Sequence, residues 1–133
     1  MGLDDDLQTA AKLVEDRCGL EAMWLYGSVA AGRAGEESDI DIGVLVPTSP
    51  SFDDRLALQG ALETLLGRPV DLVFLNEVSP VLGMQVLGKG RLVVNRNPHQ
   101  QAEFVVRTIT AYFDLKRSRA VVERALKERM NHG

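Results

Sequence analysis

Residues 25–46 read LYGSVAAGRAGEESDIDIGVLV and decide the fold, because they contain two strand-like segments joined by a polar, glycine-containing loop. The first strand ends at Gly27-Ser28, where Ser28 can cap a short helical turn. The second strand spans residues 39–46 and is ended by a proline. The stretch therefore predicts a strand, a tight turn, a loop and a second strand that begins with acidic residues.

Asp39 and Asp41 flank Ile40 at the start of the second strand. Alternate side chains of a strand share a face, so both carboxylates point the same way while Ile40 and Ile42 point into the core. Two like charges about 7 Å apart repel each other, and aspartate disfavours strands. A magnesium ion, which takes carboxylate and phosphate oxygens together, would remove this conflict. The alternative is an exposed strand face or a turn before the strand.

Two further features fit the same chemistry. Asp71 interrupts an apolar run, and a carboxylate there needs a partner, a metal or a place at the mouth of a site, unless it faces water at the strand end. Gly27 allows a ligand to approach the backbone, and a helix start at Ser28 offers N–H groups to a phosphate, although a simple capped turn has the same sequence. Together these parts would suit two-metal phosphoryl transfer, with the third acid accepting a proton from the attacking hydroxyl.

The rest of the chain predicts alternating helices and strands. Helices are expected at about 5–18, 53–66, 79–87 and 97–130, and strands at about 21–26, 39–46, 70–75 and 92–94. We expect the strand 70–75 to be central because it is the most apolar, and Asn97 to cap the last helix. The fold class is α/β (α+β), a small mixed sheet flanked by helices in one domain spanning 1–133, with a catalytic core at about 20–95 and a long C-terminal helix.

Composition excludes several classes of protein. The chain of 133 residues is 45% hydrophobic and 26% charged, which fits one globular domain. No apolar run approaches the roughly 18 residues of a membrane span. Cys18 is alone and acidic residues begin the chain, so no disulfide framework is expected, and the location is expected to be cytoplasmic. The net charge of −4 gives no general case for binding nucleic acid. Residues 1–63 hold 13 acidic and 4 basic residues, and residues 64–133 hold 6 and 11, so the second half suits an anionic substrate or an acidic partner.

Gly27-Ser28 followed by Asp39-x-Asp41, together with Val70-Asp71-Leu72-Val73, resembles the signature of the minimal nucleotidyltransferases (MNT) of the DNA polymerase β superfamily. The resemblance implies a nucleotidyltransferase sheet in which Asp39, Asp41 and Asp71 hold two Mg²⁺ ions and Gly27-Ser28 binds nucleotide phosphate. Free-standing members of this size resemble antitoxins paired with a helical HEPN ribonuclease toxin. The implied activity is transfer of AMP from ATP to a tyrosine of that toxin.

Other functions stay open on sequence alone. Nucleotide transfer to a small hydroxylated molecule of the aminoglycoside type would need an acceptor pocket, which a homodimer could build between two chains. A non-catalytic antitoxin could instead block its toxin by contact. The last helix would be about 50 Å long, and its apolar and basic residues beyond Leu115 favour docking of a partner protein. The alternative is that the helix bends near Arg117-Ser118 and folds back on its own domain.

Overall fold

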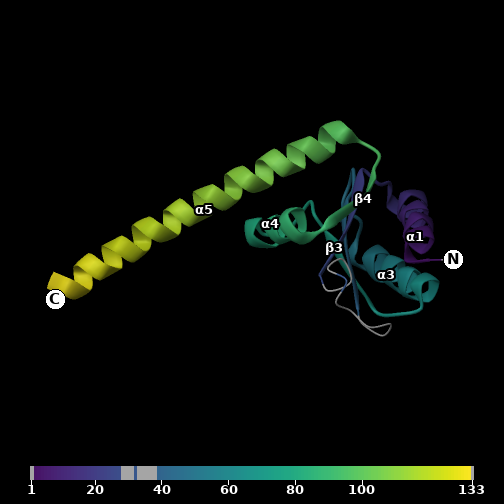
Figure 1. Ribbon diagram of the computed structural model, residues 1–133, viewed down its shortest axis with the longest axis horizontal. Coiled ribbons are helices and arrows are strands. Elements are labelled where there is room, and N and C mark those ends of the chain that lie inside the picture. Colours follow the sequence, from purple (N-terminus) through teal and green to yellow (C-terminus); the bar gives the residue numbers. More distant parts are fainter. Residues whose placement is uncertain (1, 28–31, 33–38, 133) are drawn as a thin grey trace.

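A computed structural model describes residues 2–27, 32 and 39–132 of the chain. Within these residues one four-stranded sheet is flanked by helices (Figure 1). The short helical turn expected after Ser28 lies outside the described residues. The elements confirm the rest of the predicted order and run α1 Leu3–Cys18, β1 Ala22–Tyr26, β2 Ile40–Leu45, α3 Phe52–Leu66, β3 Val70–Phe74, α4 Pro80–Lys89, β4 Arg91–Asn95 and α5 Pro98–His132.

The strands lie in the order β3-β2-β1-β4. Strand β1 is antiparallel to β2 and to β4, whereas β3 is parallel to β2. Parallel neighbours need a crossover connection, which α3 supplies. The expectation that residues 70–75 form a central strand is wrong, because β3 lies at the edge. Its apolar character comes from helices that cover both of its faces, since Leu72 packs into one core cluster and Val73 into the other.

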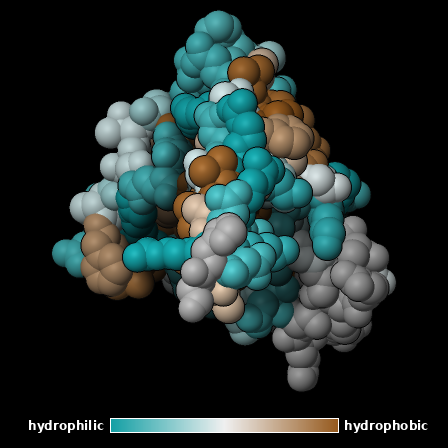
Figure 2. All heavy atoms as spheres, turned by 90° about the vertical axis from the view of Figure 1, so that its left-hand side faces the viewer, coloured by the Kyte–Doolittle hydropathy of each residue, from teal (hydrophilic) through white to brown (hydrophobic). Residues whose placement is uncertain are grey.

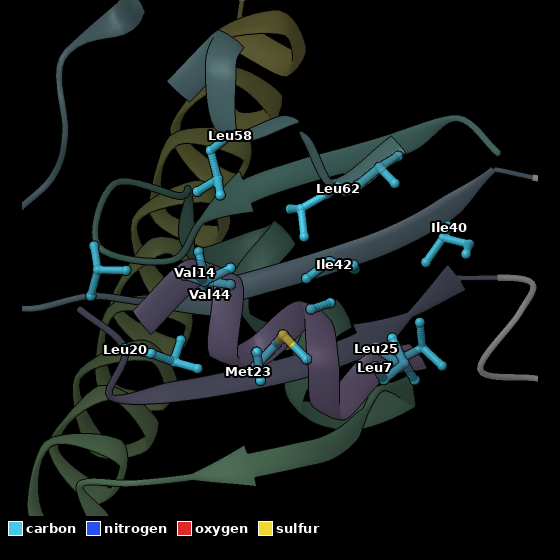
Figure 3. Packing of buried hydrophobic residues seen from close by; sticks show 14 of the residues in the cluster. Leu7, Val14, Leu20, Met23, Leu25, Ile40, Ile42, Val44, Leu58 and Leu62 are labelled. Carbon is cyan, nitrogen blue, oxygen red and sulfur yellow. The ribbon is translucent and has the colours of Figure 1, made fainter. Parts of the chain in front are cut away.

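One face of the sheet carries the main hydrophobic core beneath α1 and α3. Strand residues alternate between the two faces, and those on this face meet buried residues that recur at helical spacing in both helices. Ile40 and Ile42 are fully buried here, so Asp41 between them points to the other face. Figure 3 shows the packing of Leu7 and Val14 from α1, Met23 and Leu25 from β1, Ile40, Ile42 and Val44 from β2, and Leu58 and Leu62 from α3.

The opposite face of the sheet is covered by α4 and the first half of α5. Trp24 of β1 packs against Phe104 of α5 with ring centroids 5.5 Å apart, and Val86 of α4 is fully buried in the same cluster. Gly83 of α4 lies so close to α5 that a β-carbon there would be 2.7 Å from the methyl group of Thr108. The glycine therefore lets the two helices cross in direct contact.

Helix α5 is continuous over 35 residues. The side chain of Asn97 accepts a hydrogen bond from the backbone N–H of Gln100 at 3.3 Å, which confirms the predicted cap. Phe104 and Thr108 are buried, yet every residue from 116 to 131 is exposed, and Figure 1 shows this part of the helix leaving the rest of the molecule. In the described part of the chain, no helix is both long enough and apolar enough to cross a membrane.

Arg55 ties α3 to the segment that follows β3. Its guanidinium donates to both carboxylate oxygens of Glu77, at 2.6 and 2.8 Å, and its Nε donates to the carbonyl of Pro50 at 3.0 Å. The guanidinium carbon also lies 4.7 Å from the centre of the Phe74 ring. The hydrogen bonds from Arg55 hold the pKa of Glu77 below its usual value.

Arg55→Met should lower the midpoint of thermal unfolding at neutral pH, because Glu77 loses its bidentate partner. A carboxyl whose pKa is lowered by folding stabilises the protein above its unfolded pKa, about 4.5 for Glu77, and loses that contribution as pH falls through the folded pKa. The difference in midpoint from wild type should therefore shrink below about pH 4. Calorimetry over a pH series measures it. A difference that does not change with pH, or one that Glu77→Gln does not reproduce, would contradict the assignment.

Candidate active site

The acids predicted from the sequence meet in a row across neighbouring strands. Asp41 of β2 is the register partner of Asp71 on the parallel strand β3 and of Tyr26 on the antiparallel strand β1. The three side chains point to the α4 face, because the residues adjoining them in each strand are buried in the core under α1 and α3. The row lies at the end of the sheet where β1 ends and where β2 and β3 begin.

Asp39 lies immediately before β2, two positions from Asp41. Asp39 and Asp71 are exposed, whereas Asp41 is half-buried. The charges of Asp71 and Asp39 both act on the carboxyl group of Asp41. The structure therefore brings the three predicted acids into one negative cluster that is open to solvent.

The electrostatics of this cluster oppose further negative charge. Burial, the charges of Asp71 and Asp39, and a side-chain hydrogen bond with Asp71 raise the pKa of Asp41 above its usual value. Burial, followed by the charges of Asp71 and Asp41, raises the pKa of Tyr26 to about 12. A cation placed between the carboxylates would convert this repulsion into attraction.

The donor set fits a hard cation that brings further ligands with it. Across residues 2–27, 32 and 39–132, no three acidic, histidine or cysteine side chains by themselves surround a point where a metal ion would sit. Mg²⁺ is commonly held by one or two carboxylates, with waters and substrate phosphates completing its octahedron. The adjacent Asp41 and Asp71 carboxylates fit such an ion shared with a nucleotide.

Gly27 makes room for the carboxylate of Asp41. Its φ is +73°, in the left-handed region that favours glycine. A β-carbon at Gly27 would lie 2.0 Å from Oδ2 and 2.9 Å from Cγ of Asp41. The sequence predicts that Gly27 binds phosphate. In the structure, Asp41 also occupies the space that a side chain at Gly27 would need. Ser28, its expected partner in phosphate binding, lies outside the described residues.

Tyr26 is a member of the row that sequence analysis did not single out. The pattern of residues 21–26 predicts a strand but does not indicate which strand pairs with it. The antiparallel pairing of β1 with β2 sets the last residue of β1 opposite Asp41. A correct prediction of this strand pairing would have placed Tyr26 beside the carboxylates.

Comparison with known proteins adds a second line of observation. The model of the family described as polymerase beta, nucleotidyltransferase matches residues 8–99. The chain is 33% identical over 103 residues to the protein adenylyltransferase MntA of Shewanella oneidensis, spanning 77% of this chain and 73% of that protein. It is also 33% identical over 85 residues to the protein adenylyltransferase MntA of Thermococcus cleftensis, spanning 64% of this chain and 86% of that protein.

Solved structures share the fold over nearly the whole chain. A chain in a crystal structure of a toxin–antitoxin complex with AMP-PNP matches with a TM-score of 0.80 at 29% identity, over 95% of this chain and 99% of that chain. A chain from a complex of tri-AMPylated Shewanella oneidensis HEPN toxin with MNT antitoxin matches with a TM-score of 0.75 at 28% identity, over 94% of this chain and 99% of that chain. These matches confirm the fold expected from the sequence.

Gly27→Ala should abolish nucleotide transfer, whereas Gly67→Ala should leave it intact. The two glycines have φ of +73° and +70°, so both substitutions cost on the order of 1 kcal/mol in backbone strain. A β-carbon at Gly67 meets nothing within 4 Å, while one at Gly27 displaces the carboxylate of Asp41. The measurement is incorporation of label from α-labelled ATP, with thermal melts to compare folding. Equal activity of the two variants would contradict this role of Gly27.

Proposed function

The chain belongs to the polymerase β nucleotidyltransferase family, and on that basis we propose that it is an antitoxin that transfers AMP from ATP to a tyrosine of a HEPN toxin. The observation that carries the proposal is the meeting of Asp41 and Asp71 across parallel strands, with Gly27 against Asp41. The MntA relatives are named protein adenylyltransferases, and the solved complexes include AMP-PNP and an AMP-modified HEPN toxin. These names support a protein acceptor over a small hydroxylated molecule.

The acids of the cluster would hold magnesium. Asp39, Asp41 and Asp71 are the proposed ligands of two Mg²⁺ ions, which when bound neutralise phosphate charge and draw electron density from the α-phosphate. Gly27 and Ser28 are the proposed phosphate-binding residues, through backbone N–H groups and the serine hydroxyl. The contact between Gly27 and Asp41 would keep the phosphate and metal subsites next to each other.

The transfer exchanges one phosphorus–oxygen bond for another. The tyrosine oxygen of the toxin attacks the α-phosphorus of ATP, the bond from that phosphorus to the bridging oxygen of the β-phosphate breaks, and pyrophosphate leaves. Asp71 is the proposed acceptor of the phenolic proton, since its exposure allows an incoming hydroxyl to reach it. Tyr26 is protonated near neutral pH, as an ordinary tyrosine is, and its pKa of about 12 keeps it uncharged in alkaline solution as well.

Asp41→Asn should abolish AMP transfer while keeping the fold. The substitution preserves shape and removes one charge from a crowded negative cluster, so the thermal midpoint without magnesium should equal or exceed that of wild type. Loss of a carboxylate that holds the metal should reduce the rate by more than about 100-fold. The assay mixes the protein with α-labelled ATP, magnesium and the product of the adjacent gene as the candidate toxin, and that product is then weighed by mass spectrometry.

Asp16→Asn is the matched control for this experiment. Asp16 is exposed on α1, so its substitution makes the same chemical change away from the cluster, and transfer should stay at the wild-type rate. Undiminished transfer by Asp41→Asn would overturn the assignment of the site. If the toxin gains no AMP mass in the presence of the wild-type protein, the proposal that the toxin is the acceptor is overturned.

A further inference from the structure

The last part of α5, which we call the distal helix (residues 116–131), makes no contribution to the core. All sixteen of its residues are exposed. Helix α5 packs only through its first half, where Phe104 and Thr108 are buried and Ala111 and Leu115 are half-buried. At 1.5 Å per residue the distal helix extends about 24 Å from the last packed turn, and Figure 1 shows it projecting past α4 rather than turning back over the sheet.

Catalysis by the family domain does not account for this segment. The family match ends at residue 99, the second residue of α5, and all the acids of the proposed site lie within it. In proteins most helical stability comes from tertiary packing of an amphipathic side and not from intrinsic propensity. The distal helix therefore needs a partner outside the chain's own core.

Its side chains form an amphipathic surface without a cover. Val122, Leu126 and Met130 follow Leu115 at spacings of seven, four and four residues, which places them on one side of the helix. The exposed fractions of the three are 56%, 53% and 81%. Figure 2 views the molecule from the side to which the helix points and shows apolar side chains emerging among hydrophilic ones. We call Val122, Leu126 and Met130 the distal stripe.

The charge around the distal stripe indicates which kind of partner would bind it. The distal helix carries six basic residues and two acidic ones. A second copy of the same helix would bring two positive surfaces together, whereas a partner with acidic residues around an apolar groove would be attracted. An amphipathic helix that lays its apolar side into such a groove is a recurrent mode of protein recognition.

The comparisons connect this segment with a toxin partner. The chain from the AMP-PNP complex matches 95% of this chain, which leaves only about seven of 133 residues unmatched, fewer than the sixteen of the distal helix. Much of the distal helix is thus shared with a chain crystallised in a toxin–antitoxin complex. We infer that the distal stripe is the docking surface for the HEPN toxin and that it binds an apolar groove lined by acidic residues on that toxin. This inference rests on the proposed function.

The test separates docking from catalysis. Val122→Gln combined with Leu126→Gln makes the distal stripe polar while keeping good helix formers, and Ala120→Gln combined with Val121→Gln makes two apolar-to-Gln changes on the opposite side of the helix. Toxin binding is measured by titration calorimetry with the product of the adjacent gene as the candidate HEPN toxin, and AMP transfer is measured over a range of toxin concentrations. A chain cut after Leu115 serves as a third variant, since residues 116–131, which it loses, are all exposed.

The stripe variant and the shortened chain should bind toxin at least about 10-fold more weakly, with unchanged thermal midpoints. Their AMP transfer should slow at low toxin concentration and recover at high concentration, because docking affects the KM for the toxin and not the chemistry. The control variant should match wild type. Wild-type affinity in the stripe variant would overturn the inference while leaving the proposed function standing. A wild-type dimer that becomes monomeric only in the stripe variant, without toxin, would assign the stripe to a second copy and also overturn it. Absence of AMP transfer by all chains including wild type would overturn the proposed function itself.

Discussion

The carboxylates of Asp41 and Asp71 repel each other, yet the strand pairing holds the two residues side by side. The parallel ladder between β2 and β3 fixes them as register partners, and the residues next to them, Ile40 and Val70, are buried on the opposite face. A shift of one residue in either strand would turn a carboxylate into the hydrophobic core. The core under α1 and α3 therefore holds the site together, because the free energy gained by burying those apolar residues exceeds the repulsion at the row.

The face that carries the site changes character along the strands. Beside the row of Tyr26, Asp41 and Asp71, the next position on β2 is Gly43, and the side chain of Leu75 occupies the space a β-carbon would need, at 3.1 Å. Beyond it the face carries the second apolar cluster, which packs against α4 and α5. Helix α4 ends at Lys89 and is capped by Gly90, where a β-carbon would lie 3.3 Å from that of Tyr26. The helix thus stops beside the row and leaves the carboxylates accessible.

Local patterns in the sequence were enough to predict the elements and the orientation of Asp41, because alternation within a strand sets where its side chain points regardless of what packs nearby. The same alternation put Ile40 and Ile42 in the core, as the structure has them. The sequence did not indicate which strands pair with each other. The edge position of β3 and the place of Tyr26 both depend on which strands become neighbours, and apolar content does not distinguish a central strand from an edge strand covered by helices on both faces. The contact of Gly27 with Asp41 depends on the same pairing. The predicted phosphate-binding role of Ser28 concerns a residue that the structure does not describe, so it stays a prediction.

The exposed end of α5 can unfold locally, whereas the rest of the molecule unfolds together. Melting of the sheet, α1, α3 and α4 requires the loss of a shared core, whereas the helix beyond Leu115 is held only by its own backbone hydrogen bonds and by local ion pairs such as that between Arg117 and Asp114. Amide hydrogens in this segment should exchange by fraying, far faster than those of the strands. For the isolated chain, proteases would meet an open cleavage site without waiting for global unfolding. The lifetime of the intact polypeptide would then depend on how long a partner is bound to the end of α5, and not on the free energy of unfolding of the domain.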